Sequence, residues 1–358
     1  MKAIALGILL TAAFAVLGAQ AAGHSDPSPT VNEAVYNAKM LALANLHPQH
    51  NCRPAPALAS PPPSASGPVA KMPVRHKKAP LRPCAKPKWP AHAAYPDAGA
   101  LLPFNRIVAY YGNFYSKQMG ILGQYPQAEV IAKLDAIVAA WTKADPTTPV
   151  VPALDYIAVS AQASPGPDGK YRMRMPAAQI ETAIHMADQV HGLVFLDVQP
   201  GWSSLQAELP PLAQYLKLPN VELALDPEFA LTPGKRPGVW RGTMGAAEIN
   251  FAAQWLANIV RTNHLAPKVL VVHRFTQRMV TGSSLIRPLP QVEIVMDMDG
   301  FGSPAHKKAA YRDFIERQPV QFTGFKLFYK NDVKWGDHLM TPGEILALSP
   351  RPIYIVYQ

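Results

Sequence analysis

Eight short apolar runs, rich in β-branched and aromatic residues, recur between Phe104 and the end of the chain. They cover residues 107–111, 150–154, 192–196, 221–225, 269–272, 292–296, 322–328 and 353–357. Nearly continuous apolar runs are typical of strands that are covered on both faces, as in a parallel sheet. Residues 128–141, 176–190, 246–261 and 303–317 repeat apolar positions at intervals of three and four, which predicts helices between strands. The series therefore predicts an α/β fold.

Eight strand–helix alternations within residues 104–358 match the usual size of a (β/α)8 barrel, the TIM-type fold. A doubly wound open sheet is the alternative. The first predicted strand, however, runs into Gly112 and Asn113, and no glycine-rich phosphate loop follows it. We therefore predict a (β/α)8 barrel domain over residues 104–358.

Residues 22–103 differ in composition, because proline, alanine, serine and basic residues predominate. Proline fixes φ and removes a backbone donor, while small and basic side chains bury little surface, so we predict a largely extended linker. Loosely periodic apolar residues indicate a short helix over 31–46. Cys52 and Cys84 also lie here. They either form a disulfide, which an oxidising compartment favours, or remain two unpaired thiols.

Residues 1–21 have the features of a signal peptide. Lys2 precedes an apolar stretch, and Ala19-Gln20-Ala21 provides a cleavage signal. The apolar stretch is shorter than the roughly 20 residues that span a bilayer, although a membrane anchor is the alternative. We expect a secreted or periplasmic protein.

The net charge of +10 belongs mainly to the N-terminal part of the chain. Residues 104–358 carry 24 basic and 21 acidic side chains, so the predicted barrel is nearly neutral. The basic run from Lys71 to Lys88 is either a solvated linker or a peripheral contact with an anionic surface. Because the chain carries an export signal and this run lacks interleaved aromatic residues, we expect no nucleic-acid partner.

Polar side chains follow the predicted strands at all eight ends, and catalytic residues of barrels lie at these ends. Carboxylates stand at four of them: Asp155 after the second strand, Asp197 after the third, Asp226 and Glu228 after the fourth, and Asp297 and Asp299 after the sixth. Residues two apart on a strand face the same way, so each pair can present two carboxylates to one site. Asp155 suits a helix cap equally well.

Two opposed carboxylates are the usual machinery for hydrolysing glycosidic bonds. Glu228 is the predicted acid, and Asp226 would orient it or stabilise charge. Asp197, Asp297 or Asp299 would supply the second carboxylate. Carboxylates in close contact raise each other's pKa, which keeps one of them protonated near neutral pH. The sequence thus predicts a glycoside hydrolase that acts on a polysaccharide or cell-wall glycan.

The predicted substrate-binding residues are of two kinds. Aromatic side chains near strand ends would stack on sugar rings or pack in the core; they are Tyr110, Tyr111, Trp202, Phe229, Phe301 and Tyr329. The polar members are Asn113, Gln199, His273, Arg274 and Lys326. Lys326 would bind an anionic sugar group or fix a carboxylate. His273 would act as a general base or as a hydrogen-bonded wall residue.

Six segments that carry most of these residues resemble a family of exported bacterial barrel proteins without an assigned activity. They are residues 108–115, 195–199, 226–229, 271–277, 295–300 and 324–330. The resemblance covers essentially the whole barrel and implies its fold and export. In addition, Asp226-Pro227-Glu228 is similar to the D-x-E ending of the family 18 chitinase motif, whose earlier aspartates and glycine this chain lacks.

Two alternatives have different chemistry. A metal-dependent hydrolase would use His273 with Asp197, Asp226, Asp297 or Asp299 as ligands. Only His273 lies at a predicted strand end, and the chain has no H-x-H or H-E-x-x-H spacing, so we expect no zinc and no other cofactor. Mg²⁺ or Ca²⁺ on carboxylates is the variant left open. A non-catalytic glycan-binding or cell-wall-binding barrel is the other alternative.

Overall fold

The structure is a computed structural model that describes residues 30–46 and 87–358. The predicted signal peptide and the predicted Cys52–Cys84 pair lie outside the described residues. Most of the basic run lies outside them as well.

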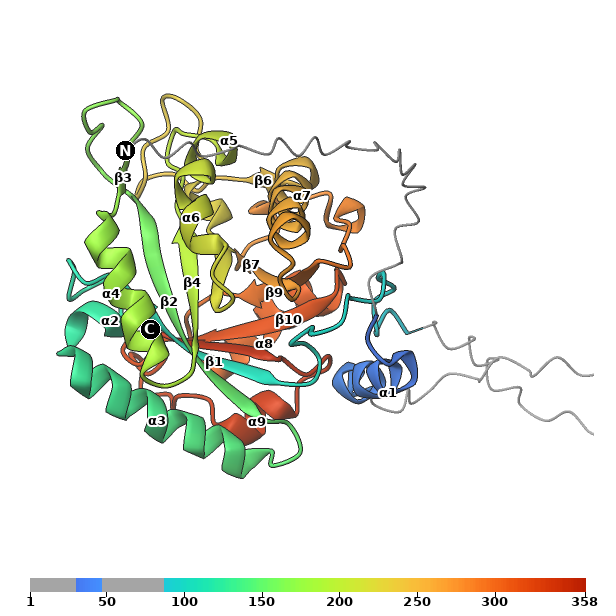
Figure 1. Ribbon diagram of the computed structural model, residues 1–358. Helices are drawn as coiled ribbons and strands as arrows, with labels where there is room; N and C mark the ends of the chain where they lie inside the picture. Colours follow the sequence, from blue (N-terminus) through green and yellow to red (C-terminus); the bar gives the residue numbers. More distant parts are fainter. Residues whose placement is uncertain (1–29, 47–86) are drawn as a thin grey trace, which may run out of the picture.

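Eight parallel strands form a closed barrel (Figure 1). They are β1 (Arg106–Gly112), β2 (Val150–Ala161), β4 (Leu193–Val198), β5 (Val221–Leu225), β7 (Lys268–Arg274), β9 (Val292–Met298), β10 (Phe322–Leu327) and β11 (Tyr354–Tyr357). Each strand pairs with the next in this series, and β1 pairs with both β2 and β11, so the sheet has no break. The predicted (β/α)8 barrel is confirmed, and the open sheet is excluded because β1 joins the two ends of the series.

Helices lie between the strands along the chain and around the outside of the barrel (Figure 1). The α-helices are α2 (Ile121–Gln124), α3 (Gln127–Ala144), α4 (Ala177–Asp188), α5 (Leu205–Glu208), α6 (Ala213–Leu216), α7 (Ala246–Asn263), α8 (Pro304–Tyr311) and α9 (Pro342–Leu346). Shorter turns are η1 (Pro210–Leu212), η2 (Pro227–Phe229), η3 (Ser283–Leu285) and the π-helical η4 (Arg312–Glu316). Short strands β3 (Arg172–Arg174), β6 (Met244–Gly245) and β8 (Val280–Thr281) extend the loops. The four predicted helices correspond to α3, α4, α7 and α8 with η4.

The long helices cover the barrel with apolar stripes. In α7, Ile249, Ala253, Leu256 and Val260 recur at intervals of three and four, and all are buried. This spacing places them on one helix face, which packs on the outer side chains of the strands. The other face of α7 carries exposed polar residues, so the helix lies between core and solvent as the sequence pattern predicts.

The barrel interior changes character along the strands. In β7, Val269 and Val271 lie in an apolar cluster, and His273 follows on the same face. In β9, Val295 precedes Asp297 in the same way. The middle of the interior is therefore apolar, and polar groups lie at both ends. Glu222 and Glu293 are buried near the strand starts, where both accept hydrogen bonds from backbone N–H groups. Burying polar groups costs free energy unless they have partners, and several polar atoms at the carboxyl ends of the strands have none in the described residues, so this end calls for a functional explanation.

Helix α1 (Glu33–Ala44) lies against the barrel at the end where the strands begin (Figure 1). Tyr36 and Met40 are buried in the interior cluster, and Arg351 N, just before β11, donates to Leu43 O at 2.7 Å. The helix predicted over 31–46 is thus present. No helix in the described part of the chain is both long and apolar enough to cross a membrane.

The second strand differs from its prediction. Asp155 and Tyr156 were expected at its end, but β2 continues to Ala161, and Asp155 lies in the middle of the strand. A polar residue ends an apolar run in the sequence, yet it need not end a strand. The barrel interior accommodates Asp155 because the Tyr354 hydroxyl donates to its Oδ2 at 2.7 Å.

Candidate functional site

A pocket of about 650 Å³ opens at the carboxyl ends of the strands. Four of the predicted polar residues line it, together with one predicted tyrosine: Gln199, Asp226, Asp299, Lys326 and Tyr111. Glu228 lines it too, from the turn η2 directly after β5. Cavities of this size hold small-molecule ligands, and barrels carry their active sites at this end. The pocket is therefore the candidate active site.

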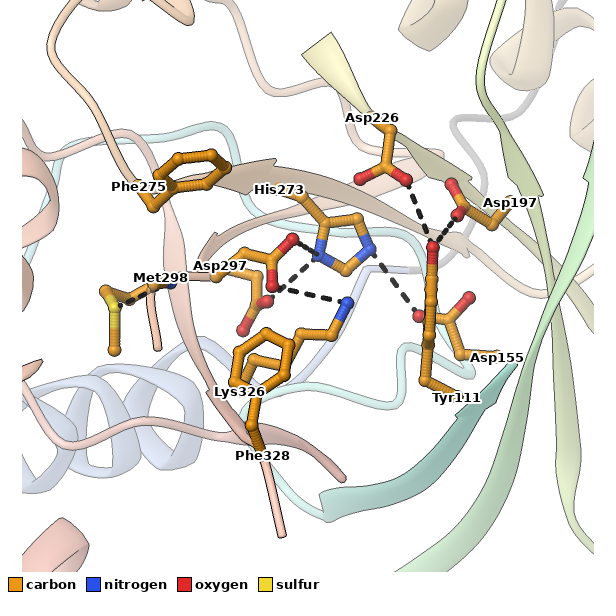
Figure 2. A network of polar contacts seen from close by, with 12 residues as sticks. Tyr111, Asp155, Asp197, Asp226, His273, Phe275, Asp297, Met298, Lys326 and Phe328 are labelled. Carbon is orange, nitrogen blue, oxygen red and sulfur yellow. Dashed lines mark hydrogen bonds and ion pairs between the residues drawn. The ribbon is translucent and has the colours of Figure 1, made fainter. Parts of the chain in front are cut away.

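Tyr111 and Gln199 form the floor of the pocket with Asp226. The Tyr111 hydroxyl lies 2.9 Å from Asp197 Oδ2 and 3.1 Å from Asp226 Oδ2 (Figure 2). Gln199 Nε2 donates to the Tyr111 hydroxyl at 3.0 Å and to Asp226 Oδ2 at 2.9 Å. The Tyr111 hydroxyl has a single proton, so it can donate a hydrogen bond to only one of the two carboxyl groups at a time. Its contact with the other group requires that this group be protonated.

The pKa values of the two carboxyl groups indicate where that proton resides. Burial raises the pKa of Asp197 well above its usual range, and the neighbouring charges of Asp226 and Asp155 raise it further. Burial also acts to raise the pKa of Asp226, but the positive charges of His273 and Lys326 outweigh it and lower the pKa overall. Asp197 therefore holds the proton and Asp226 is the ionised partner.

Glu228 lies at the rim with a different environment. Its side chain is partly exposed, and among the described residues it makes no hydrogen bond and no ion pair. Burial, and then the negative charges of Asp226 and Asp299, raise its pKa to about 8. Glu228 is thus a carboxylic acid that stays mostly protonated at neutral pH and faces an open pocket, as a general acid requires.

Asp299 provides a second pocket carboxyl group. Its Oδ1 lies 3.2 Å from Lys326 Nζ, and both side chains are buried. Burial raises the pKa of Asp299, and the charges of Lys326 and His273 limit the rise to about 6. Lys326 Nζ also lies 3.5 Å from the centre of the Tyr111 ring, a cation–π contact that fixes the ammonium over the floor. Asp299 is therefore mostly ionised above pH 6.

His273 lies below the pocket floor. Its Nδ1 is 3.0 Å from Asp297 Oδ2 and 3.9 Å from Asp299 Oδ2, and its Nε2 is 3.5 Å from Asp155 Oδ2 (Figure 2). Gly324 on the adjacent strand leaves room for this arrangement, because a Cβ there would come within 2.5 Å of Asp297 Oδ1. Neither His273 nor Asp297 lines the pocket, and Asp197 does not line it either.

A buried ion pair holds the loops beside the pocket. Lys307 Nζ lies 2.9 Å from Asp332 Oδ2 and donates to the backbone carbonyls of Gly300 and Lys326 at 2.7 Å each. Asp332 in turn accepts from the backbone N–H groups of Gly302 and Phe328. The loop after β9 and the end of β10 are thereby fixed to each other, which positions Asp299 and Lys326.

Aromatic side chains form the upper walls of the pocket. Phe229 and Phe301, both predicted, line it together with Phe275 and Phe328. The Phe301 side chain is 59% exposed, so part of its face is open to a ligand. Arg241 lines the same wall, with its guanidinium 5.3 Å from the centre of the Phe275 ring. The site thus combines a charged floor with apolar walls.

Several predicted site residues lie elsewhere because neighbouring strand residues face opposite sides. Tyr110 faces the helices, where its hydroxyl donates to Lys133 O at 3.2 Å and lies 3.3 Å from that of Tyr329. Arg274, next to His273, also points outward. Its guanidinium donates to four backbone carbonyls, including those of Phe314 and Val280.

Tyr329, Trp202 and Asn113 are also absent from the lining of the pocket. Tyr329 stacks on Tyr357 with ring centres 5.4 Å apart. Trp202 packs on Tyr171 at 4.2 Å. Asn113 donates to Ile157 O at 3.0 Å and accepts from Tyr115 N, so it shapes the loop after β1. Their contacts are those of structural residues.

Sequence reasoning did not include some residues of this region. Phe275, Phe328 and Arg241 reach the pocket from loops, and no local pattern distinguishes them. Tyr354 was not included either, and Asp155 was expected at a strand end or as a helix cap; both lie inside the barrel, where Tyr354 OH donates to Asp155 Oδ2. The alternation of inward and outward residues along β2 and β11 is the signal that identifies both as interior.

No protein-family model matches the sequence, and no curated protein matches it either. Solved structures that match are distant. A GH5-4 broad specificity endoglucanase from Clostridium acetobutylicum is 13% identical, with 70% of this chain and 87% of that chain covered and a TM-score of 0.38. The Bacillus subtilis mannanase man26 is also 13% identical, with 71% and 80% covered and a TM-score of 0.34.

A dihydropteroate synthase from Xanthomonas albilineans is matched as well, at 9% identity, with 72% of this chain and 88% of that chain covered and a TM-score of 0.30. An endoglucanase, a mannanase and a synthase are enzymes of different kinds. At these identities and TM-scores, none of the three assigns a reaction to this chain.

Proposed function

We propose that the protein is an exported glycoside hydrolase that acts on a polysaccharide, with Glu228 as general acid and Asp299 as the second carboxylate. The observation that supports this most is that Glu228 and Asp299 line one pocket in different surroundings, since Lys326 Nζ lies 3.2 Å from Asp299 Oδ1 and Glu228 makes no ion pair in the described residues. The pKa of Glu228 is raised to about 8, and that of Asp299 is held at about 6. Between these values one group is mainly a carboxylic acid and the other mainly a carboxylate.

This pair matches the chemistry of glycosidic bond cleavage. Glu228 would give its proton to the leaving-group oxygen as the bond to the anomeric carbon breaks. Asp299, held by Lys326 at 3.2 Å, would stabilise the positive charge that develops on the sugar ring or activate the incoming water. Of the three candidates for the second carboxylate, Asp197 and Asp297 lie below the floor, and Asp299 lines the pocket.

Asp226 would assist Glu228, the general acid, and would not itself donate the proton. Its negative charge lies close enough to raise the pKa of Glu228. Its Oδ2 is held by Tyr111 and Gln199, so the charge stays in one place during the reaction. A fixed charge needs no reorganisation when the proton leaves Glu228, which lowers the barrier.

The walls of the pocket suit a sugar chain. A pyranose ring has apolar C–H faces and polar edges. Phe229 and Phe301 offer aromatic faces for the former, and Gln199, Asp226 and Lys326 offer polar groups for the latter. The proposed export rests on the sequence of residues 1–21.

A hydrolysis screen tests the proposal. The purified protein is incubated with polysaccharides and peptidoglycan, and new reducing ends are measured. Glu228→Gln removes the acid while keeping the side-chain shape, and Glu181→Gln makes the same change at an exposed residue of α4. Turnover that Glu228→Gln abolishes and Glu181→Gln leaves intact would support the proposal. Glycan binding without turnover, equal in all three proteins, would refute it in favour of a binding protein.

A further inference from the structure

Three buried side chains meet below the pocket floor: Asp155 of β2, Asp197 of β4 and His273 of β7. Each has no exposed surface, and one ligand atom from each lies within 4.8 Å of the other two. The three come from separate strands of a closed barrel, so their positions are fixed by the fold. None of them lines the pocket above.

Each of the three has one polar atom held by a neighbour. Tyr354 OH donates to Asp155 Oδ2 at 2.7 Å, and Tyr111 OH lies 2.9 Å from Asp197 Oδ2. His273 Nδ1 lies 3.0 Å from Asp297 Oδ2. A carboxylate that bonds one ring nitrogen of a histidine fixes its tautomer and directs the other nitrogen toward a metal ion.

The second polar atom of each side chain lacks a hydrogen bond. Asp155 Oδ1, Asp197 Oδ1 and His273 Nε2 are all buried without a hydrogen-bond partner in the described residues, and the nearest carboxylate oxygen to Nε2, Asp155 Oδ2, is 3.5 Å away. A buried polar atom without a partner costs roughly 1–3 kcal/mol, and three of them beside one another make a costly arrangement unless something bonds them.

The excess of negative charge in the same region also favours a bound cation. Five aspartates surround His273: Asp155, Asp197, Asp226, Asp297 and Asp299. Among the described residues, Lys326 is the lysine that the pocket presents to them. Even a protonated His273 would leave more negative than positive groups, so a further cation would stabilise the cluster.

We propose that Asp155, Asp197 and His273 bind a divalent transition-metal ion beneath the floor of the pocket. One imidazole nitrogen with two carboxylates suits Zn²⁺ or Mn²⁺ better than Mg²⁺ or Ca²⁺, which prefer oxygen ligands alone. Binding would displace the proton that Asp197 holds in the absence of the ion, because carboxylate ligands are deprotonated. The ion would then hold Asp197, and through it Tyr111, in place under the substrate. This site is independent of the glycosidase proposal, and it departs from our sequence-based expectation of no metal.

A second group of possible ligands shares the same imidazole. Asp226, His273 and Asp299 also have ligand atoms within 4.8 Å of one another. Asp226 Oδ1 is likewise buried without a hydrogen bond in the described residues, but Asp299 Oδ1 already faces Lys326 Nζ at 3.2 Å. A metal ion there would be repelled by the ammonium, so the first group is the better site.

Metal titration of the full chain tests the site without any substrate. The protein is stripped with a chelator, dialysed, and titrated with ZnCl₂ alone by calorimetry, while melting temperature is followed in parallel. Co²⁺ serves as a second probe, because nitrogen and oxygen ligation gives it visible absorption bands. We expect stoichiometric Zn²⁺ binding and a higher melting temperature in Zn²⁺ than in chelator.

Variants then locate the site. Asp155→Asn and His273→Gln remove ligands and should abolish binding, while Asp297→Asn should weaken it about 10- to 100-fold through the imidazole. Asp299→Asn changes a neighbouring buried acid and should keep wild-type affinity. If His273→Gln does not fold, Asp297→Asn and the Co²⁺ spectrum still report on the imidazole.

Two outcomes would overturn the proposal. If the wild-type chain binds neither Zn²⁺, Mn²⁺ nor Co²⁺ and melts at the same temperature in chelator, a proton on His273 balances the cluster instead. If Asp299→Asn weakens binding as strongly as Asp155→Asn, the ion occupies the other group. Neither outcome affects the hydrolysis screen, so failure of the metal site and failure of the glycosidase proposal can be distinguished.

Discussion

Lys326 Nζ lies 3.2 Å from Asp299 Oδ1, and both side chains are almost completely removed from solvent. Burial alone would keep Asp299 protonated, because a charged carboxylate is poorly stabilised inside a protein. The adjacent ammonium offsets this penalty, and the pKa of Asp299 reaches only about 6. Glu228, whose side chain has no such direct partner, rises to about 8. Lys326 lowers the pKa of both carboxyl groups, but its ion pair is with Asp299, the group with the lower pKa.

The pH dependence of activity should be bell-shaped. Asp299 must be ionised, so kcat/KM should fall as the pH drops below about 6, where this group gains a proton. Glu228 must be protonated, so kcat/KM should fall as the pH rises above about 8. Initial rates on any substrate found in the screen, measured from about pH 4 to about pH 10, check this. A flat profile between pH 5 and 9 would contradict these roles.

Replacing the general acid should remove most of the activity. In Glu228→Gln, no proton is available for the leaving group, and we expect kcat to fall about 100- to 10,000-fold. The melting temperature should change little, because the Glu228 side chain makes no hydrogen bond in the described structure. A substrate with an activated leaving group, which needs no protonation, should recover part of the lost rate. Equal losses on activated and unactivated substrates would argue against an acid role.

Removing the ammonium should shift the acid side of the pH profile. In Lys326→Met, the pKa of Asp299 should rise, so activity should begin to fall at a higher pH than in the wild type. Breaking a buried ion pair should also cost about 3–5 kcal/mol of the free energy of unfolding, measured by urea denaturation. Lys330→Met, at an exposed position three residues after the end of β10, is the control and should change neither quantity.

The hydroxyl of Tyr111 should contribute to stability. Tyr111→Phe leaves Asp197 and Asp226 with one buried hydrogen-bond partner fewer, and should lower the free energy of unfolding by about 1–3 kcal/mol. Tyr115→Phe is a matched control, because the Tyr115 side chain is 59% exposed. Urea midpoints of the two variants should therefore differ. Identical midpoints would mean that the floor network adds nothing to stability.

Helix α1 should be an integral part of the barrel. Met40 is 5% exposed and Leu41, the next residue, is 60% exposed. Met40→Ala should lower the free energy of unfolding by about 2–5 kcal/mol, because it opens a cavity beneath the barrel. Leu41→Ala should change it by less than about 0.5 kcal/mol. If both variants unfold at the same denaturant concentration, α1 does not stabilise the barrel.

Much of the fold follows from the sequence because secondary structure has a local signal. Apolar runs that strands need on two covered faces identified all eight barrel strands, and helical spacing identified α1, α3, α4, α7 and α8 with η4. The predicted ends of the strands were less accurate. Asp155 appeared to end the second strand, although β2 continues to Ala161. Asp155 is accommodated in mid-strand because another strand supplies a hydrogen-bond donor, the Tyr354 hydroxyl. This donor is distant in the sequence, so no local pattern around Asp155 reveals it.

The sequence by itself determined the barrel, the end of it where the strands finish and the set of acids near that end. These follow from the spacing of apolar residues and from the order of strands and helices along the chain. Only the tertiary structure decided which acids share the pocket. Asp299 lines it with Glu228, whereas Asp197 and Asp297 lie beneath it beside His273. It also decided that Tyr110 and Arg274 face outward. The physical reason is that pKa, burial and contact depend on distances between strands far apart in the chain, which local patterning does not encode.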